Sequence, residues 1–289
     1  MADNNEISAL LTLIDDPDGE VFGVVSDKIV EYGKSIIPNL EHLWENTVDE
    51  SLQERLELLI HRLHFTDLKE DFRQWNVSGH HDLMLGALLV AKFHYPDLLT
   101  APVLLEIEKL RRNIWLELNN YLTPLEQVRI VTGILYGYFG LKGGEISYTN
   151  INEFLLHKVL ETKRGNQVGN AIVYLILCDL LDVPVKAIGI PKQFVLAYFK
   201  RGYSSDLPLD QYISQVEFFV DPTSGQVFVQ KDIDAYFKRL GVAQEPQFFK
   251  PLTNRQILQN VLAELIKCNE EPQQAYKQDE LKWLIESLE

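Results

Sequence analysis

Apolar residues recur every three to four positions along much of the chain, which is the spacing of helices that bury one face. This pattern predicts helices over residues 7–14, 21–30, 51–75 and 82–93. The run Asp15–Asp18, which contains a proline, separates the first two helices, and Gly33 is a stop signal for the second. The N-terminal stretch therefore resembles helical hairpins of the HEAT-repeat kind, in about one copy.

Two further helices are predicted over residues 103–119 and 124–139. The second begins with Thr123-Pro124-x-Glu126, in which proline occupies the first helical turn. The glycines of residues 140–144 end this helical region.

The pattern changes after Asn152 to one apolar helix followed by strands. The helix is predicted over residues 171–181, and β-branched and aromatic residues then dominate 185–199 and 216–229. The polar segment 200–215 is predicted to connect these two runs as a long hairpin loop. This is the α+β part of the chain.

The chain returns to helix at its C-terminal end. Thr253-Asn254-Arg255-Gln256 is a capping box before an amphipathic helix, and a last helix is predicted over 273–288. The fold class is therefore mostly helical α+β with a small antiparallel sheet. We expect a HEAT-like helical region (1–80), a central domain (81–250, with a helical lead-in over 81–150 and a core over 151–250) and a C-terminal helix pair (251–289).

Composition narrows the classes of function. The 289 residues carry a formal net charge of -15, which repels phosphate backbones and argues against nucleic-acid or anionic-membrane partners. The N-terminal residues are acidic where a signal peptide is basic, and the most apolar stretch is too short to span a bilayer. Cys178 and Cys268 are far apart and form neither a disulfide framework nor a metal clip. We expect a cytoplasmic protein.

Several passages, in order and spacing, resemble the SirB-type bacterial family, which carries a transglutaminase-like domain with an N-terminal helical region and a tetratricopeptide-like tail. They are Asp82–Ala91 with Tyr95–Asp97, Asn152–Leu155 with Val159–Leu160, Arg164–Asn166, Gly189–Phe194 and Phe219–Pro222. The resemblance implies a papain-like central α+β domain. It also implies a shortened tail of one helix pair.

The chemistry of transglutaminases requires a cysteine at a helix N-terminus, a histidine on the next strand and an acid on the strand after it. By resemblance, these three positions fall on Gly169, Gln193 and Asp221. Gly169 has no nucleophile, and the amide of Gln193 cannot act as a base near neutral pH. All seven histidines lie at or before His157, so none follows the nucleophile helix. We therefore expect no catalytic residues at these positions.

The same region supplies candidates for a binding cleft: Arg164, Asn166, Asn170, Gln193 and Asp221. Asp221-Pro222-Thr223-Ser224-Gly225 is either a relic of the acid or a plain turn. Gln193 could hydrogen-bond Asp221 across the former site. The pair His61-x-x-His64 and the segment His80–Asp82 are weak evidence for a metal site, and we expect no metal and no cofactor.

The leading hypothesis is a non-catalytic transglutaminase-like protein that binds a protein or peptide partner. The aromatic residues of the strand region are consistent with such recognition. Two alternatives are a hydrolase or transferase with rearranged chemistry, which uses Asp221 with Gln193 or an exposed Cys178, and an assembly module that binds through its end helices. The sequence does not define the oligomeric state.

Overall fold

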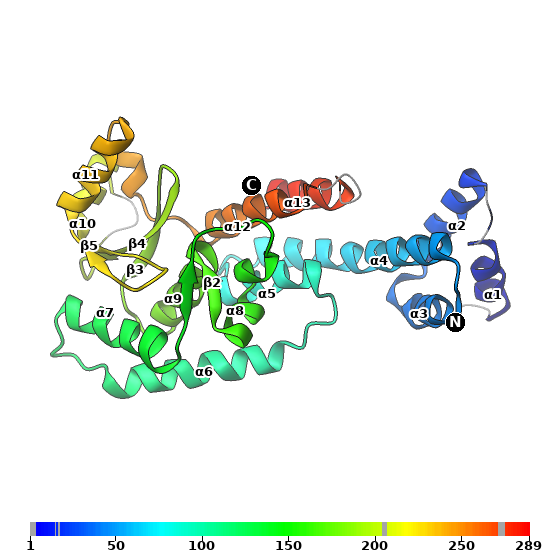
Figure 1. The fold of residues 1–289 in the computed structure, drawn as a ribbon, viewed down its shortest axis with the longest axis horizontal. Coiled ribbons are helices and arrows are strands. Elements are labelled where there is room, and N and C mark those ends of the chain that lie inside the picture. The colour runs from blue at the N-terminus through cyan, green and yellow to red at the C-terminus, as the bar shows by residue number, and fades with distance from the viewer. Residues whose placement is uncertain (1–3, 15, 17, 204–206, 271–274) are drawn as a thin grey trace. The chain divides into compact units, whose positions relative to one another are not determined.

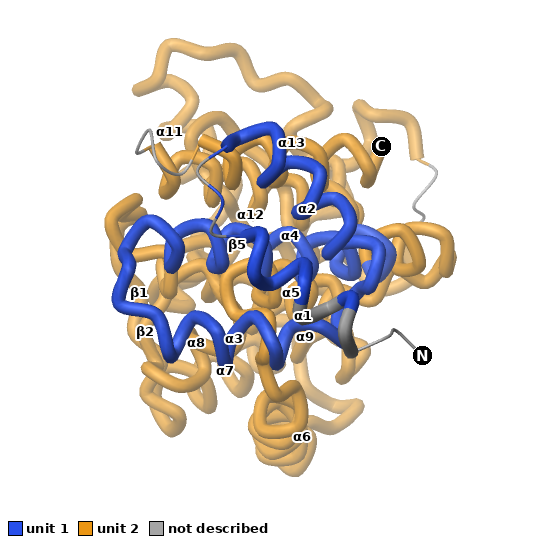
Figure 2. The backbone as a smooth tube through the Cα atoms, turned by 90° about the vertical axis from the view of Figure 1, so that its right-hand side faces the viewer, with its two compact units in different colours: residues 1–71 blue, residues 72–289 orange. Residues whose placement is uncertain are grey.

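The chain divides into two compact units, residues 1–71 and 72–289 (Figure 2). The structure, a computed structural model, describes residues 4–14, 16, 18–203, 207–270 and 275–289. The mostly helical α+β class predicted from the sequence is confirmed. The three-domain division, with boundaries after residues 80 and 250, stays a prediction.

The first unit consists of helices around one apolar core. It contains α1 (Asn4–Leu13), α2 (Gly19–Glu31), the 3-10 turn η1 (Gly33–Ile36), α3 (Ile37–Asn46) and the first part of α4 (Glu50–Val77). Fully buried Ile29, Leu40 and Leu56 lie in its core. Asp18 caps α2 by accepting a hydrogen bond from the amide of Glu20 (2.8 Å). The HEAT-like character of these helices stays a prediction.

The second unit carries the sheets and most of the helices (Figure 1). Its N-terminal helices are α5 (Leu83–His94), α6 (Thr100–Glu117), α7 (Pro124–Thr132), the π-helical turn η2 (Gly133–Tyr138), the 3-10 turn η3 (Ile151–Phe154) and α8 (Leu156–Thr162). The helix start predicted at Thr123-Pro124 is present in α7, with proline in the first turn, and Thr123 and Glu126 also form a capping box there. The short helix α8 was not expected from the sequence.

Helix α9 (Gln167–Leu180) is the central helix of this unit. It is buried continuously from Val168 to Cys178 and packs against strands β3 and β4 and helices α5, α6 and α8. It begins four residues before the predicted start at 171. The reason is the cap: the side chain of Asn166 accepts hydrogen bonds from the amides of Val168 and Gly169 (3.0 Å each).

The main sheet has four antiparallel strands in the order β3 (Val185–Ile190), β4 (Gln193–Phe199), β5 (Val216–Val220) and β6 (Val227–Phe228). The predicted run 185–199 is therefore a hairpin, with Lys192 at a φ of 63° in its turn. The long connection from β4 to β5 includes the 3-10 turn η4 (Leu209–Gln211) and α10 (Tyr212–Gln215). Helix α11 (Gln230–Leu240) follows β6 and was not predicted.

A second sheet pairs β1 (Lys142–Gly144) in parallel with β2 (Arg164–Asn166), which leads directly into α9. After the 3-10 turn η5 (Pro246–Phe249), the C-terminal helix pair is confirmed as α12 (Asn254–Cys268) and α13 (Ala275–Ser287). Thr253 and Gln256 form the predicted capping box. Residues 273 and 274, where the last helix was predicted to begin, lie outside the described residues.

Candidate binding groove

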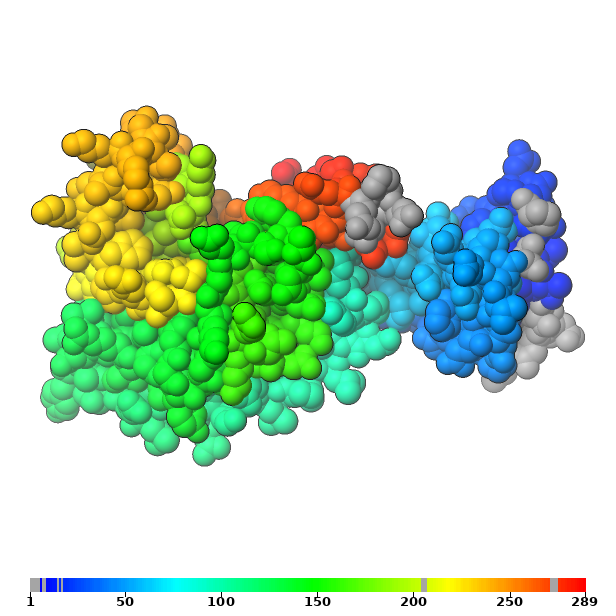
Figure 3. Space-filling model, in the orientation of Figure 1, coloured from blue at the N-terminus to red at the C-terminus, as the bar shows by residue number. Residues whose placement is uncertain are grey.

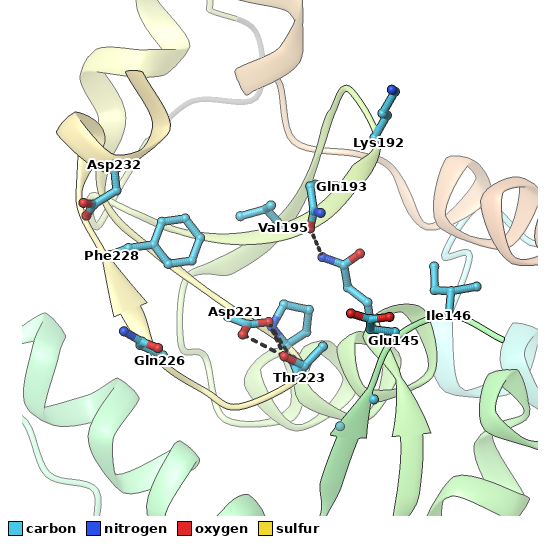
Figure 4. A pocket seen from close by; sticks show the side chains of 14 residues that line it. Glu145, Ile146, Lys192, Gln193, Val195, Asp221, Thr223, Gln226, Phe228 and Asp232 are labelled. Carbon is cyan, nitrogen blue, oxygen red and sulfur yellow. Dashed lines mark hydrogen bonds between the residues drawn. The ribbon is translucent and has the colours of Figure 1, made fainter. Parts of the chain in front are cut away.

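Three hollows of about 860, 540 and 540 Å³ share Gln193 and together form an open groove in the second unit. The largest lies between the end of β1, the start of α9, the β3–β4 hairpin and the turn after β5 (Figure 4). Its lining includes Gln167, Gln193 and Asp221. Two of the three positions implied by the family resemblance therefore reach the same groove.

The start of α9 presents an amide to this groove. Gln167 is the first residue of the helix, directly after the Asn166 cap. Its Nε2 donates a hydrogen bond to Oε1 of Gln193, on the first residue of β4, at 2.6 Å (Figure 4). Two primary amides thus face each other across the start of α9 and the start of β4. The side chain at this point was missed because the helix was predicted to begin later.

Gly169, which was taken as the nucleophile position, does not line the groove. It is buried, and a Cβ placed on it would overlap the carbonyl oxygen of Glu153 and crowd Val159. A cysteine or serine at this position would therefore clash with neighbouring chain. The residue of the first helical turn that points toward Gln193 is Gln167, two positions earlier.

Asp221 holds the turn that follows β5. Its carboxylate accepts hydrogen bonds from the amide and hydroxyl of Thr223 (2.8 and 2.7–2.8 Å) and from the hydroxyl of Ser224 (2.8 Å). The hydrogen bond that Gln193 could have made to Asp221 is not formed: Gln193 pairs with Gln167, and Asp221 with its own turn (Figure 4). Of the two readings of this segment, the geometry favours the turn.

The π-helical segment η2 holds this turn through a hydrogen bond. The hydroxyl of Tyr136 donates a hydrogen bond to the carbonyl oxygen of Pro222 (2.6 Å). Burial, with a smaller effect from the charge of Asp221, raises the pKa of Tyr136, so the group remains a neutral donor. On the other side, a Cβ at Gly143 in β1 would overlap the backbone of Thr223. Main chain therefore meets main chain at this wall of the groove.

The remaining cleft candidates lie away from the groove lining. Arg164 is exposed on β2. Asn166 is buried and caps α9, so its role is local. Asn170 is buried, and neither atom of its amide has a hydrogen-bond partner among the described residues. Its Oδ1 occupies the space that a Cβ at Gly165 would take.

The two cysteine thiols and the last histidine of the sequence are also in environments that do not suit nucleophilic catalysis. Cys178 is fully buried in α9, and burial raises the pKa of its thiol. Burial likewise raises the pKa of Cys268 to about 11. Burial lowers the pKa of His157 to about 4. Within the described ranges, no group of three or more His, Cys, Asp or Glu side chains is placed to hold a metal ion.

A family model described as the transglutaminase-like superfamily matches residues 101–263, more than half of the chain. The chain belongs to this superfamily. A UPF0162 protein of Pasteurella multocida (strain Pm70) is 30% identical over 101 residues, which are 34% of this chain and 38% of that protein. The match thus spans well under two thirds of that relative. No solved structure matches.

Across the described part of the chain, no helix combines the length and the apolar character that a membrane crossing requires.

Proposed function

We propose that this protein is a non-catalytic, SirB-type member of the transglutaminase-like superfamily, and that its groove binds a peptide or an extended segment of a protein. The hydrogen bond between Gln167 and Gln193 carries this proposal. Neither amide can serve as nucleophile or general base near neutral pH. The groove therefore keeps the framework of a transglutaminase-like site, but these amides stand in it without a reactive group.

The paired amides are suited to reading a polypeptide. The bond between them occupies one hydrogen of Gln167 and one lone pair of Gln193, and the Gln193 amide also interacts with the hydroxyl of Tyr236. The Oε1 of Gln167 therefore keeps an acceptor, and the Nε2 of Gln193 keeps one hydrogen to donate. A peptide backbone presents the complementary groups at every residue. Val195 and Phe228 add apolar lining beside these amides, while Lys192 contributes a positive charge. Such mixed walls are typical of sites that orient an extended ligand through a few polar groups.

The alternative of a rearranged enzyme has less support. The carboxylate of Asp221 is engaged by Thr223 and Ser224, which leaves it poorly placed to activate water. The thiol of Cys178 is buried and holds its proton. The binding role of the end helices is a separate alternative.

The test is selection from a randomised displayed peptide library against the full chain, followed by affinity measurement on the selected peptide. We expect Gln193→Ala and Gln167→Ala each to weaken binding by about tenfold, the effect of losing one well-placed hydrogen bond. Gln211→Ala, an exposed glutamine outside the groove lining, is the matched control.

Two results would contradict the proposal. One is binding that both groove variants leave unchanged. The other is turnover of glutaminyl peptides, thioesters or amides by the wild-type chain that disappears in Gln167→Ala or Gln193→Ala.

A further inference from the structure

Helix α6 leaves large apolar side chains on its outward face. Its inward face is buried through Val103, Ile107, Leu110 and Ile114. On the other side, Leu104 is 40% exposed, Leu105 71%, Trp115 62% and Leu116 74%. A surface helix normally carries polar residues there. Helix α6 lies along the margin of the second unit, where its blue-green atoms form an edge (Figure 3). Exposed apolar side chains on one helix face, here in two groups on either side of Glu108 and Arg112, mark an interaction site.

The order of residues along this face is self-complementary. Leu105, Glu108, Arg112 and Trp115 follow one another at spacings of three and four, so they share the outward stripe. In an antiparallel pairing about a two-fold axis at the level of Leu110, positions equally far from Leu110 in opposite directions meet. Leu105 then meets Trp115 of the second copy, and Glu108 meets Arg112.

We propose that α6 pairs in antiparallel orientation with α6 of a second copy of this chain, which makes the protein a two-fold symmetric dimer. The flanking Leu104 meets Leu116 in the same register, so apolar contacts lie on both sides of a central charged layer. The two-fold axis creates two crossed pairs of Glu108 with Arg112. These pairs fix both the register and the orientation.

Charge complementarity favours an antiparallel second copy of α6 as the partner of this face. A parallel pairing would place Glu108 on Glu108 and Arg112 on Arg112, which like-charge repulsion disfavours. Within its own helix, Glu108 pairs with Arg111 (2.7 Å), and Arg112, one turn further on, also acts on the charge of Glu108. Glu108 of a second copy supplies a further carboxylate to the exposed Arg112. The apolar stripe is short, so association in the micromolar range is expected.

Sedimentation equilibrium of the full chain tests the proposal. It is run at physiological salt, because a net charge of -15 on each copy opposes association when screening is weak. The expected mass at high protein concentration is twice 33.3 kDa. Leu105→Glu together with Trp115→Glu should weaken the dimer at least about tenfold. The control is Tyr138→Glu, which introduces a charge at a residue that is 70% exposed and lies outside α6.

Charge reversal tests the register itself. Glu108→Arg and Arg112→Glu should each weaken the dimer, because each sets like charges against one another across the axis. The double variant Glu108→Arg with Arg112→Glu should restore it, since the exchanged residues meet again. A monomer mass for the wild-type chain, a dimer unaffected by the changes at Leu105 and Trp115, or a double reversal that fails to restore association would each overturn the proposal.

Discussion

Asp221 and Gln193 line the same groove but differ in what their side chains can still offer. Asp221 is engaged by hydrogen bonds from its own turn. Gln193 makes one bond through its Oε1, and its exposed amide group lies toward the groove. Asp221 therefore has a structural role, which is to hold its own turn. Gln193 has capacity for a ligand. A family position alone therefore does not reveal whether a polar residue still serves recognition.

His157 differs from both residues, because its side chain neither holds a turn by hydrogen bonds nor faces the groove. It is buried, and neither ring nitrogen has a hydrogen-bond partner within the described ranges. Its pKa falls to about 4 from the usual 6.5, chiefly through burial. The unfolded chain therefore binds a proton more readily than the folded one. The resulting stability is present above pH 6.5 and is lost as the pH falls toward 4.

The largest predicted effect follows from this shift. Lowering the pH from 7 to below 4 should cost about 3 kcal/mol of unfolding free energy through His157 alone. Urea denaturation of the wild-type chain and of His157→Phe, measured across this range, separates that contribution from the carboxylates. The variant should lose less stability on acidification, and parallel curves for the two proteins would contradict the assignment.

A smaller effect is expected at the engaged carboxylate. Asp221→Ala removes the acceptor for Thr223 and Ser224, and it should lower the free energy of unfolding by about 2 kcal/mol. Asp210→Ala, at an exposed aspartate in η4, is the matched control and should change it by less than about 0.5 kcal/mol. Equal stabilities in urea denaturation would mean that the turn does not depend on Asp221.

The smallest effect on stability is expected at the paired amides. Gln193→Ala breaks one exposed hydrogen bond, so the free energy of unfolding should change by less than about 0.5 kcal/mol. The same variant is expected to lose peptide affinity in the library experiment. A thermal unfolding midpoint well below that of the wild-type chain would instead place Gln193 among the residues that hold the fold.

Local sequence signals predicted the elements that depend on local chemistry. The capping box at Thr253 has the expected partner Gln256, and the helix predicted to start at Thr123-Pro124 does start there, because both signals act within one helical turn. The pairing of β1 with β2 was not predicted, since it joins two short glycine-containing segments that are distant in sequence. No periodic pattern marks such a contact.

The sequence predicted only part of the groove, because segments that are distant along the chain form it. Gln193 and Asp221 were located by the family resemblance, inside the runs 185–199 and 216–229 that the sequence marks as strands, and both line the groove. Gln167 was missed because the entry to the helix was placed near Gly169 and the helix itself was predicted to begin at residue 171. The signal for it was available: Asn166 is a strong capping residue, and reading it as the cap places Gln167 at the first helical position.

The contact between Gly143 and Thr223 has a consequence for how relatives of this protein could diversify. That wall of the groove is backbone against backbone, and a side chain at residue 143 would overlap it. Substitution can therefore remodel the opposite wall, at the exposed Lys192 and Gln193, far more freely than this one. The wall formed by Gly143 and Thr223 is expected to stay constant, and changes in ligand preference are expected to accumulate on the β3–β4 hairpin.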